Sequence, residues 1–128
     1  MDAPTPTRPT AAELDLLRVL WRQGPSTARQ THAALSRERP GIGEANVLRQ
    51  LQLMHAKGLL TRDVGARAHV YTAAEPAERL QGRLLGDLAT RLFAGSGKAL
   101  ILAALRTQVS ASEREEIVRF LNQGEGRA

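Results

Sequence analysis

Apolar residues recur at helical spacing along most of the chain, and short polar or glycine-containing breaks divide them into segments. In the first segment Leu14, Leu17 and Trp21 recur every three or four residues, which predicts a helix with one buried face. Thr10 and Glu13 have the spacing of a capping box, in which each side chain bonds to the other residue's backbone amide. We therefore expect the first helix to start at this pair and to end at the Gly-Pro break that follows.

Two more short helices are predicted before the middle of the chain. Thr27 and Gln30 repeat the capping pattern, and a weaker apolar stripe continues to the break at residues 40–41. A third helix is expected from about Glu44 to Lys57, with Gly58 placed where a left-handed cap would end it. Three short helices with tight breaks are typical of a helix-turn-helix.

A β-hairpin is predicted directly after the third helix. Residues 60–64 and 68–72 alternate partly between apolar and polar side chains, and residues 65–67 join them. Because a two-stranded hairpin is marginal alone, it should pack on the helices through a face drawn from Leu60, Val64, Val70 or Tyr71. The order of helices and hairpin predicts a mainly α fold with a small β-hairpin wing, a winged helix-turn-helix.

The pattern changes at Glu75 and Pro76, where a long amphipathic helix begins. A break at residues 95–97 separates it from another helix, and Ser110 with Glu113 caps a last one. Three helices in about fifty residues can hardly close a core alone, so we expect a second copy of the chain to complete it. The expected dimerisation residues are Leu80, Leu84, Leu88, Leu92, Phe93, Leu100, Ile101, Leu105, Ile117 and Leu121.

These segments predict three regions: a disordered lead at residues 1–9, a winged helix-turn-helix DNA-binding domain at 10–75 and a helical dimerisation domain at 76–128. The lead has three prolines, one arginine and no apolar run, so it resembles neither a signal peptide nor a membrane span. We expect a cytoplasmic protein without membrane insertion.

Composition and charge add little evidence about the function of the chain. The net charge is +5, with 10 Lys and Arg against 7 Asp and Glu up to Glu75, and 8 against 6 after it. A basic balance spread this evenly permits nucleic-acid binding without indicating it. The absence of cysteine excludes disulfides and thiolate metal sites.

Candidate catalytic and cofactor sites are weak. Residues 95–99 resemble the end of a phosphate-binding loop but lack its first glycine, the Ser or Thr after lysine and the preceding strand. His32, His55 and His69 have no metal-ligand spacing. No nucleophile, base and orienting acid occur together. We predict a regulator with no cofactor, and not an enzyme.

The chain resembles the penicillinase repressor family, which includes the beta-lactamase and methicillin-resistance repressors. The resemblance rests on the order and spacing of short motifs and extends from Thr10 to about Leu121. It implies a winged-helix domain that places its third helix in the major groove, a helical dimerisation domain and repression at palindromic operators. The motifs are Ala12-Glu13, Val19-Leu20-Trp21, Gly24-Pro25, Lys57-Gly58-Leu59-Leu60, Arg67-Ala68, Tyr71 and residues 91–96.

The resemblance also implies which residues face DNA. Family members tend to place Ser, Thr and Lys on this surface, and the chain departs from that pattern. A glutamate at position 44 would be repelled by phosphate unless it accepts a hydrogen bond from a cytosine amino group. Asn46 and Arg49 are the best candidates to read bases. The implied DNA-facing residues are Gly43, Glu44, Ala45, Asn46, Leu48, Arg49 and, at the wing, Arg67.

Two functions follow from these patterns. The first is a homodimeric transcriptional repressor bound to operator DNA. In relatives, a membrane sensor protease is associated with cleavage of the repressor. The copper-responsive relatives carry cysteine-rich metal sites, so the absence of cysteine disfavours release of the repressor by metal. The alternative is a winged-helix protein-interaction module without a specific DNA site, which Glu44, Ala45 and Leu48 favour slightly. A ligand-responsive regulator has no supporting pocket chemistry.

Overall fold

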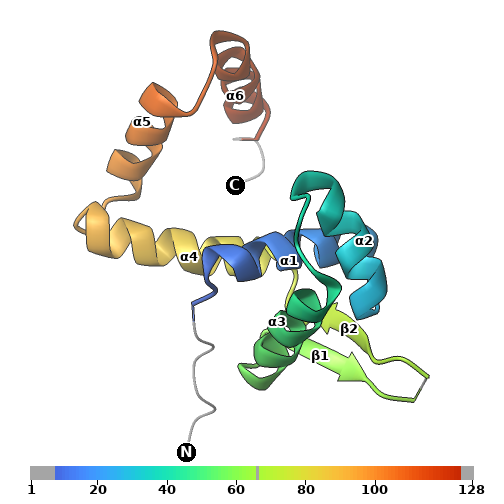
Figure 1. Cartoon of the computed structure of the whole chain (residues 1–128). Coiled ribbons are helices and arrows are strands. Elements are labelled where there is room, and N and C mark those ends of the chain that lie inside the picture. Colours follow the sequence, from blue (N-terminus) through green and yellow to red (C-terminus); the bar gives the residue numbers. More distant parts are fainter. Residues whose placement is uncertain (1–7, 66, 125–128) are drawn as a thin grey trace, which may run out of the picture. The chain divides into compact units, whose positions relative to one another are not determined.

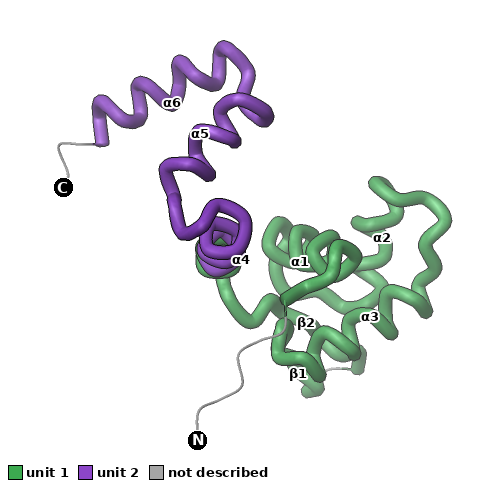
Figure 2. Tube along the Cα trace, turned by 90° about the vertical axis from the view of Figure 1, so that its left-hand side faces the viewer, with its two compact units in different colours: residues 1–82 green, residues 83–128 purple. Residues whose placement is uncertain are grey.

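The computed structural model describes residues 8–65 and 67–124, so most of the predicted N-terminal lead lies outside it. The chain forms two compact units, Met1–Gly82 and Arg83–Ala128 (Figures 1 and 2). Within the described residues the class is mainly α with one antiparallel hairpin, as the sequence predicts. The elements are α1 (Ala11–Gln23), α2 (Ala28–Glu38), α3 (Glu44–Ala56), β1 (Leu60–Asp63), β2 (Val70–Ala73), α4 (Ala77–Leu92), α5 (Gly97–Thr107) and α6 (Ala111–Gly124).

Both capping boxes predicted in the first unit are confirmed. The Glu13 amide donates to Thr10 Oγ1 at 3.1 Å, and the Thr10 amide donates to Glu13 Oε1 at 2.9 Å. Thr27 and Gln30 repeat the two bonds at 3.1 and 2.9 Å at the start of α2. Each box satisfies amides that a helix start otherwise leaves without partners, so these pairs fix where α1 and α2 begin.

The core of the first unit is built by α1, α2 and α3 together with the hairpin (Figure 1). Trp21, expected in the buried stripe of α1, is half-buried, and its indole N–H donates to the Glu75 carbonyl at 3.0 Å. This bond ties the chain that leaves the hairpin to α1. The buried apolar side chains are Leu16, Leu17, Val19, Leu20, Leu35, Val47, Leu51, Met54, Leu59, Leu60, Tyr71 and Leu80.

The wing is shorter than predicted and its loop is longer. Strand β1 ends at Asp63, whose side chain accepts from the Gly65 amide at 2.9 Å and turns the chain out of the strand. Val64 is consequently 58% exposed, whereas Leu60 and Tyr71 are buried and form the hairpin's apolar face. Strand β2 begins only at Val70, and we call the described residues between the strands, 64–65 and 67–69, the wing loop.

An additional bridge, which the sequence pattern does not reveal, joins the hairpin to the turn before α2. The Ser26 amide donates to the Tyr71 carbonyl at 3.0 Å, and the Tyr71 amide donates to the Ser26 carbonyl at 2.8 Å. The start of α2 is thereby fixed against the wing. The bridge thus joins two segments that are separated by more than forty residues.

The second unit differs in that no residue in the range 83–124 is buried. The predicted break near residue 95 is present, with Ala94 and Gly95 both at positive φ (52° and 85°). The start of α4 belongs to the first unit, where Leu80 is 2% exposed. Among the described residues no single helix has the length and hydropathy of a membrane span; α4 and α5 meet that description only as a pair, bent by 99°.

Candidate nucleic-acid interface

Buried side chains set the rotation of α3 about its own axis. Val47, Leu51 and Met54 are fully buried, and each contributes roughly 1.5–3 kcal/mol relative to an exposed position. Turning the helix would expose all three, so the opposite face is held outward. That face carries Ala45 and Arg49, and at the same helical spacing Gln52.

A histidine fixes the start of α3. The N-cap, Gly43, offers no side chain to the helix, so the cap itself does not anchor it. Instead His32 on α2 bonds through Nε2 to the Ile42 carbonyl at 2.8 Å. A carbonyl only accepts, so Nε2 carries the proton. The Ser36 hydroxyl donates to the His32 carbonyl at 2.7 Å and lies 3.1 Å from Nε2. The His32 imidazole therefore ties the turn between α2 and α3 to α2.

An ion pair fixes the other end of α3. Lys57, the residue after the helix, bonds to buried Glu13 at 2.7 Å. Burial raises the pKa of Glu13, but the hydrogen bond and charge of Lys57 and the bond from Thr10 outweigh it, and the net pKa lies below 4.5. The pair connects the first turn of α1 to the end of α3, so the carboxylate is ionised at neutral pH and holds both.

All seven residues that the family resemblance places against DNA are exposed. Arg49 lies on the outward face of α3, opposite the core, while Asn46 and Glu44 lie on opposite flanks of that face. Arg67 lies in the wing loop, next to residue 66, which is outside the described part. The structure therefore brings Glu44 and Leu48 towards the wing, and it leaves Asn46 on the far flank of the helix.

Some arginines of the first unit are paired with carboxylates and others are not. Arg18 and Arg39 bond to Asp15, and Arg22 bonds to Glu38 at 3.2 Å, all on α1 and α2. By contrast, several arginines of this unit have no hydrogen-bond or ion-pair partner among the described residues, and three of these lie exposed around α3 and the wing. Unpaired guanidinium groups are available to phosphate and base-edge acceptors. The three exposed arginines are Arg29, Arg49 and Arg67.

A hollow of about 500 Å³ lies between the first turn of α2, α3 and the wing loop, and we call it the α3–wing hollow. Its lining includes Arg29, Gln52 and His69, none of which was predicted to contact DNA. Gln52 could have been found from the spacing of Ala45 and Arg49. Arg29 could not, because its place in the hollow follows from the packing of α2 on α3 and from the long-range bridge between the turn before α2 and the wing.

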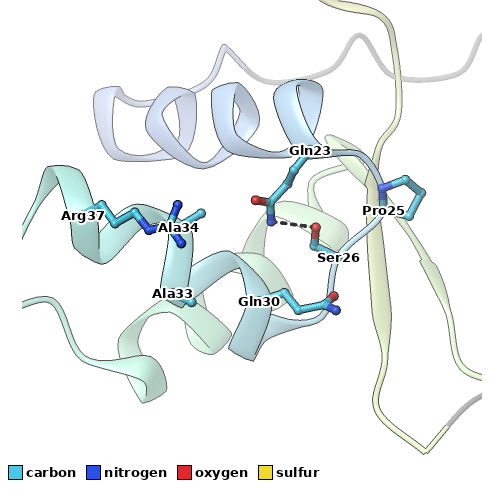
Figure 3. Close-up of a pocket in the computed structure, with 7 residues that line it drawn as sticks. All are labelled: Gln23, Pro25, Ser26, Gln30, Ala33, Ala34 and Arg37. Carbon is cyan, nitrogen blue, oxygen red and sulfur yellow. Dashed lines mark hydrogen bonds between the residues drawn. The ribbon is translucent and has the colours of Figure 1, made fainter.

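A second hollow, of about 310 Å³, lies along α1 and the outer side of α2 and shares no lining residue with the first (Figure 3). At its end nearest the turn, Gln23 Nε2 donates to Ser26 Oγ at 2.9 Å. Arg37 lies at the other end, on the last turn of α2. No group of three or more His, Cys, Asp or Glu side chains in the described part could hold a metal ion.

Comparison with known proteins identifies the architecture. The family model described as Penicillinase repressor matches residues 9–123. The transcriptional regulator Tm0710 from Thermotoga maritima has a TM-score of 0.51 at 18% identity, covering 91% of this chain and 74% of that one. A structure from work on the DNA recognition and protein interaction domains of HOP2 has a TM-score of 0.43 at 22% identity, covering 50% of this chain and 98% of that one. Among curated proteins no significant match was found.

Proposed function

The chain belongs to the penicillinase repressor family and is a DNA-binding regulator of transcription, not an enzyme; from this premise we propose that it acts as a homodimer on palindromic operators. In this proposal α3 enters the major groove and the wing loop meets the adjacent minor groove or backbone. The residues proposed to face the DNA are the seven named from the sequence: Gly43, Glu44, Ala45, Asn46, Leu48, Arg49 and Arg67.

The observation that carries this proposal is the unpaired Arg49 on the outward face of a helix whose rotation and two ends are fixed. Arginine bonds in a bidentate manner to guanine O6 and N7, and such a pair discriminates between bases by about 1–3 kcal/mol. A helix held at both ends directs the base of this side chain outward, so only the side chain itself has to be ordered on binding. Asn46 is the second proposed reader, because its amide can bond to adenine.

Dimerisation is proposed from the exposed apolar side chains of the second unit. A monomer would leave several large apolar side chains in water, which is unusual for a soluble domain and typical of an interface. A second copy of the chain would cover them symmetrically. Of the residues named from the sequence, Leu84, Phe93, Leu100, Leu105 and Ile117 are half-buried, and Leu80 is already covered within the first unit. The most exposed are Leu85, Leu88, Leu92, Ile101, Leu102, Val118, Phe120 and Leu121.

The test is binding of the purified protein to the DNA upstream of its own gene and to scrambled DNA, at physiological salt. We expect tight binding to the upstream DNA and weak binding to the scrambled DNA. Arg49→Ala should weaken the specific complex roughly 10- to 100-fold, as loss of a bidentate base contact would. Arg37→Ala, which removes the same charge from the outer hollow, is the matched control and should bind as the wild type does. Equal weak binding to both DNAs would contradict the proposal.

The competing function is a protein-interaction module, and one observation favours it: Leu48 and Leu53 are 39% and 47% exposed on α3. Salt separates the two functions. DNA affinity falls steeply with salt because bound counterions are released, whereas an apolar protein interface changes little.

Release by a membrane sensor protease that cuts the second unit is proposed from the family alone. Cleavage there would separate the two copies and lose the second half-site. An intact chain in cells under derepressing conditions, detected with an antibody, would contradict this route.

A further inference from the structure

The α3–wing hollow lies between the two elements that are proposed to enter different grooves of the duplex. Six of its lining residues come from three segments: Arg29 on the first turn of α2, Glu44, Leu48 and Gln52 on α3, and Ala68 and His69 on the wing loop. The hollow has a volume of about 500 Å³ and belongs entirely to the first unit. It lies on the surface that α3 and the wing are proposed to turn towards DNA.

In a duplex, a major groove is separated from the adjacent minor groove by the sugar–phosphate backbone of one strand. When a helix occupies one groove and a wing occupies the next, that backbone must pass between them. We infer that the α3–wing hollow receives this sugar–phosphate strand, and that Arg29, Gln52 and His69 are backbone contacts. The inference rests on the proposed DNA binding and adds contacts that neither the sequence pattern nor the family resemblance assigns.

The chemistry of the lining suits a sugar–phosphate strand. Arg29 is exposed and has no hydrogen-bond or ion-pair partner among the described residues, so its guanidinium is free to bond to a phosphate oxygen. The Gln52 amide and the His69 ring provide N–H donors on α3 and the wing. Leu48 and Ala68 present apolar surface between these polar groups, which matches the carbon atoms of deoxyribose.

Glu44 lines the same hollow, on the flank of α3 that faces the wing. No cation lies within ion-pair distance of its carboxylate among the described residues. A strand in the hollow would bring phosphate close to this carboxylate, and the like charges would repel each other. Glu44 therefore lowers affinity for every DNA sequence and does not read cytosine. Its effect on affinity is opposite to that of Arg29, which attracts the same strand.

The experiment measures DNA affinity for three variants of the full chain against salt concentration, on the upstream DNA and on scrambled DNA. Arg29→Ala should weaken binding to both DNAs by a similar factor and reduce the slope of log affinity against log salt by about 1. Arg37→Ala, on the last turn of the same helix, should leave the affinity and the slope unchanged. Glu44→Gln should strengthen binding to both DNAs roughly threefold, as expected for relief of a screened repulsion. Thermal unfolding of each variant verifies that it is folded.

Three results would overturn the inference. The first is an Arg29→Ala variant with the affinity and salt slope of the wild type. The second is a Glu44→Gln variant that binds more weakly, and only to sites that contain particular cytosines, because Glu44 would then be a base reader. The third is a wild-type protein that binds no DNA at all, which would overturn the proposed function as well. The first two leave the proposed function intact, so the two failures are distinguishable.

Discussion

At the scale of single residues, the Glu13 side chain takes part in two stabilising interactions. It completes the capping box with Thr10, and it accepts from Lys57 at the end of α3. Its side chain is 3% exposed while that of Lys57 is 33% exposed, so the carboxylate is the desolvated member of the pair. A buried carboxylate that is well bonded costs little, but one that loses its partners is strongly destabilising.

Replacing this carboxylate tests its role. Glu13→Gln should lower the free energy of unfolding by about 2 kcal/mol at pH 7, less than for a fully buried pair because Lys57 remains partly hydrated. Glu38→Gln, which removes the surface partner of Arg22, is the control and should change it by less than about 0.5 kcal/mol. Urea unfolding of both variants measures the difference, and equal losses would contradict the assignment.

The pH dependence of stability should show the same group. The pKa of Glu13 in the folded chain lies below 4.5, so its contribution to stability is present above that value. It is lost as the pH falls through the lowered folded-state pKa. We expect the stability of the wild type to decrease below about pH 4.5 more steeply than that of Glu13→Gln, measured by urea unfolding between pH 7 and pH 3. Parallel curves for the two proteins would exclude Glu13 as the titrating group.

Tyr71 makes a contrasting case, because its hydroxyl is buried with no hydrogen-bond partner among the described residues. Removing a polar atom that has no partner loses no bond and relieves its desolvation. Tyr71→Phe should therefore leave the free energy of unfolding unchanged or raise it by up to about 1 kcal/mol. Thermal unfolding measures this, and a loss of stability would mean that the hydroxyl has a partner in solution.

At the scale of elements, α3 is held by contacts from other parts of the chain and not by its own sequence. Its N-cap contributes no side chain, and its start depends on the bond from His32 to the Ile42 carbonyl. The helix could be predicted from its apolar spacing and from Gly58, which has φ +85° as expected for the cap. The hydrogen bond from His32 could not be predicted, because a lone histidine on α2 gives no signal that it reaches a turn ten residues away.

The hydrogen bond from His32 to the Ile42 carbonyl should affect DNA binding, because it positions the start of α3. His32→Ala should weaken specific DNA binding roughly fivefold, equivalent to a hydrogen bond of about 1 kcal/mol, and should affect scrambled DNA less. His32→Gln keeps a side-chain N–H donor and should restore part of the loss. His55→Ala, a histidine near the end of α3, serves as the control. Equal weakening on both DNAs would contradict a role in positioning α3.

The elements that sequence predicts well are those fixed by local chemistry. The capping boxes at Thr10 and Thr27 and the break near Gly95 all follow from residues a few positions apart. The wing ends were predicted less well, because an Asx turn at Asp63 closes β1 early. The place of Arg29 in the α3–wing hollow follows from the packing of α2 on α3 and from the bridge between Ser26 and Tyr71, which only the folded chain shows.

At the scale of the whole molecule, the second unit exposes large apolar side chains that a partner would have to cover. Leu92, Phe120 and Leu121 are 68%, 69% and 58% exposed. Leu92→Glu should convert the proposed dimer into a monomer, because a charge at an apolar interface is costly to bury. Thr90→Glu, an exposed position two residues earlier, adds the same charge on another side of α4 and should remain a dimer. Sedimentation equilibrium separates the two, and a wild type that sediments as a monomer would contradict the proposal.

The central claim, a homodimer that reads operator DNA, is tested most directly by selecting bound duplexes from a random DNA pool with the purified chain and sequencing them. The account predicts enrichment of an inverted repeat whose half-sites are centred a whole number of helical turns apart, each turn about 10 base pairs. Enrichment of a single half-site would contradict the homodimer. A pool without any enriched sequence would contradict sequence-specific recognition.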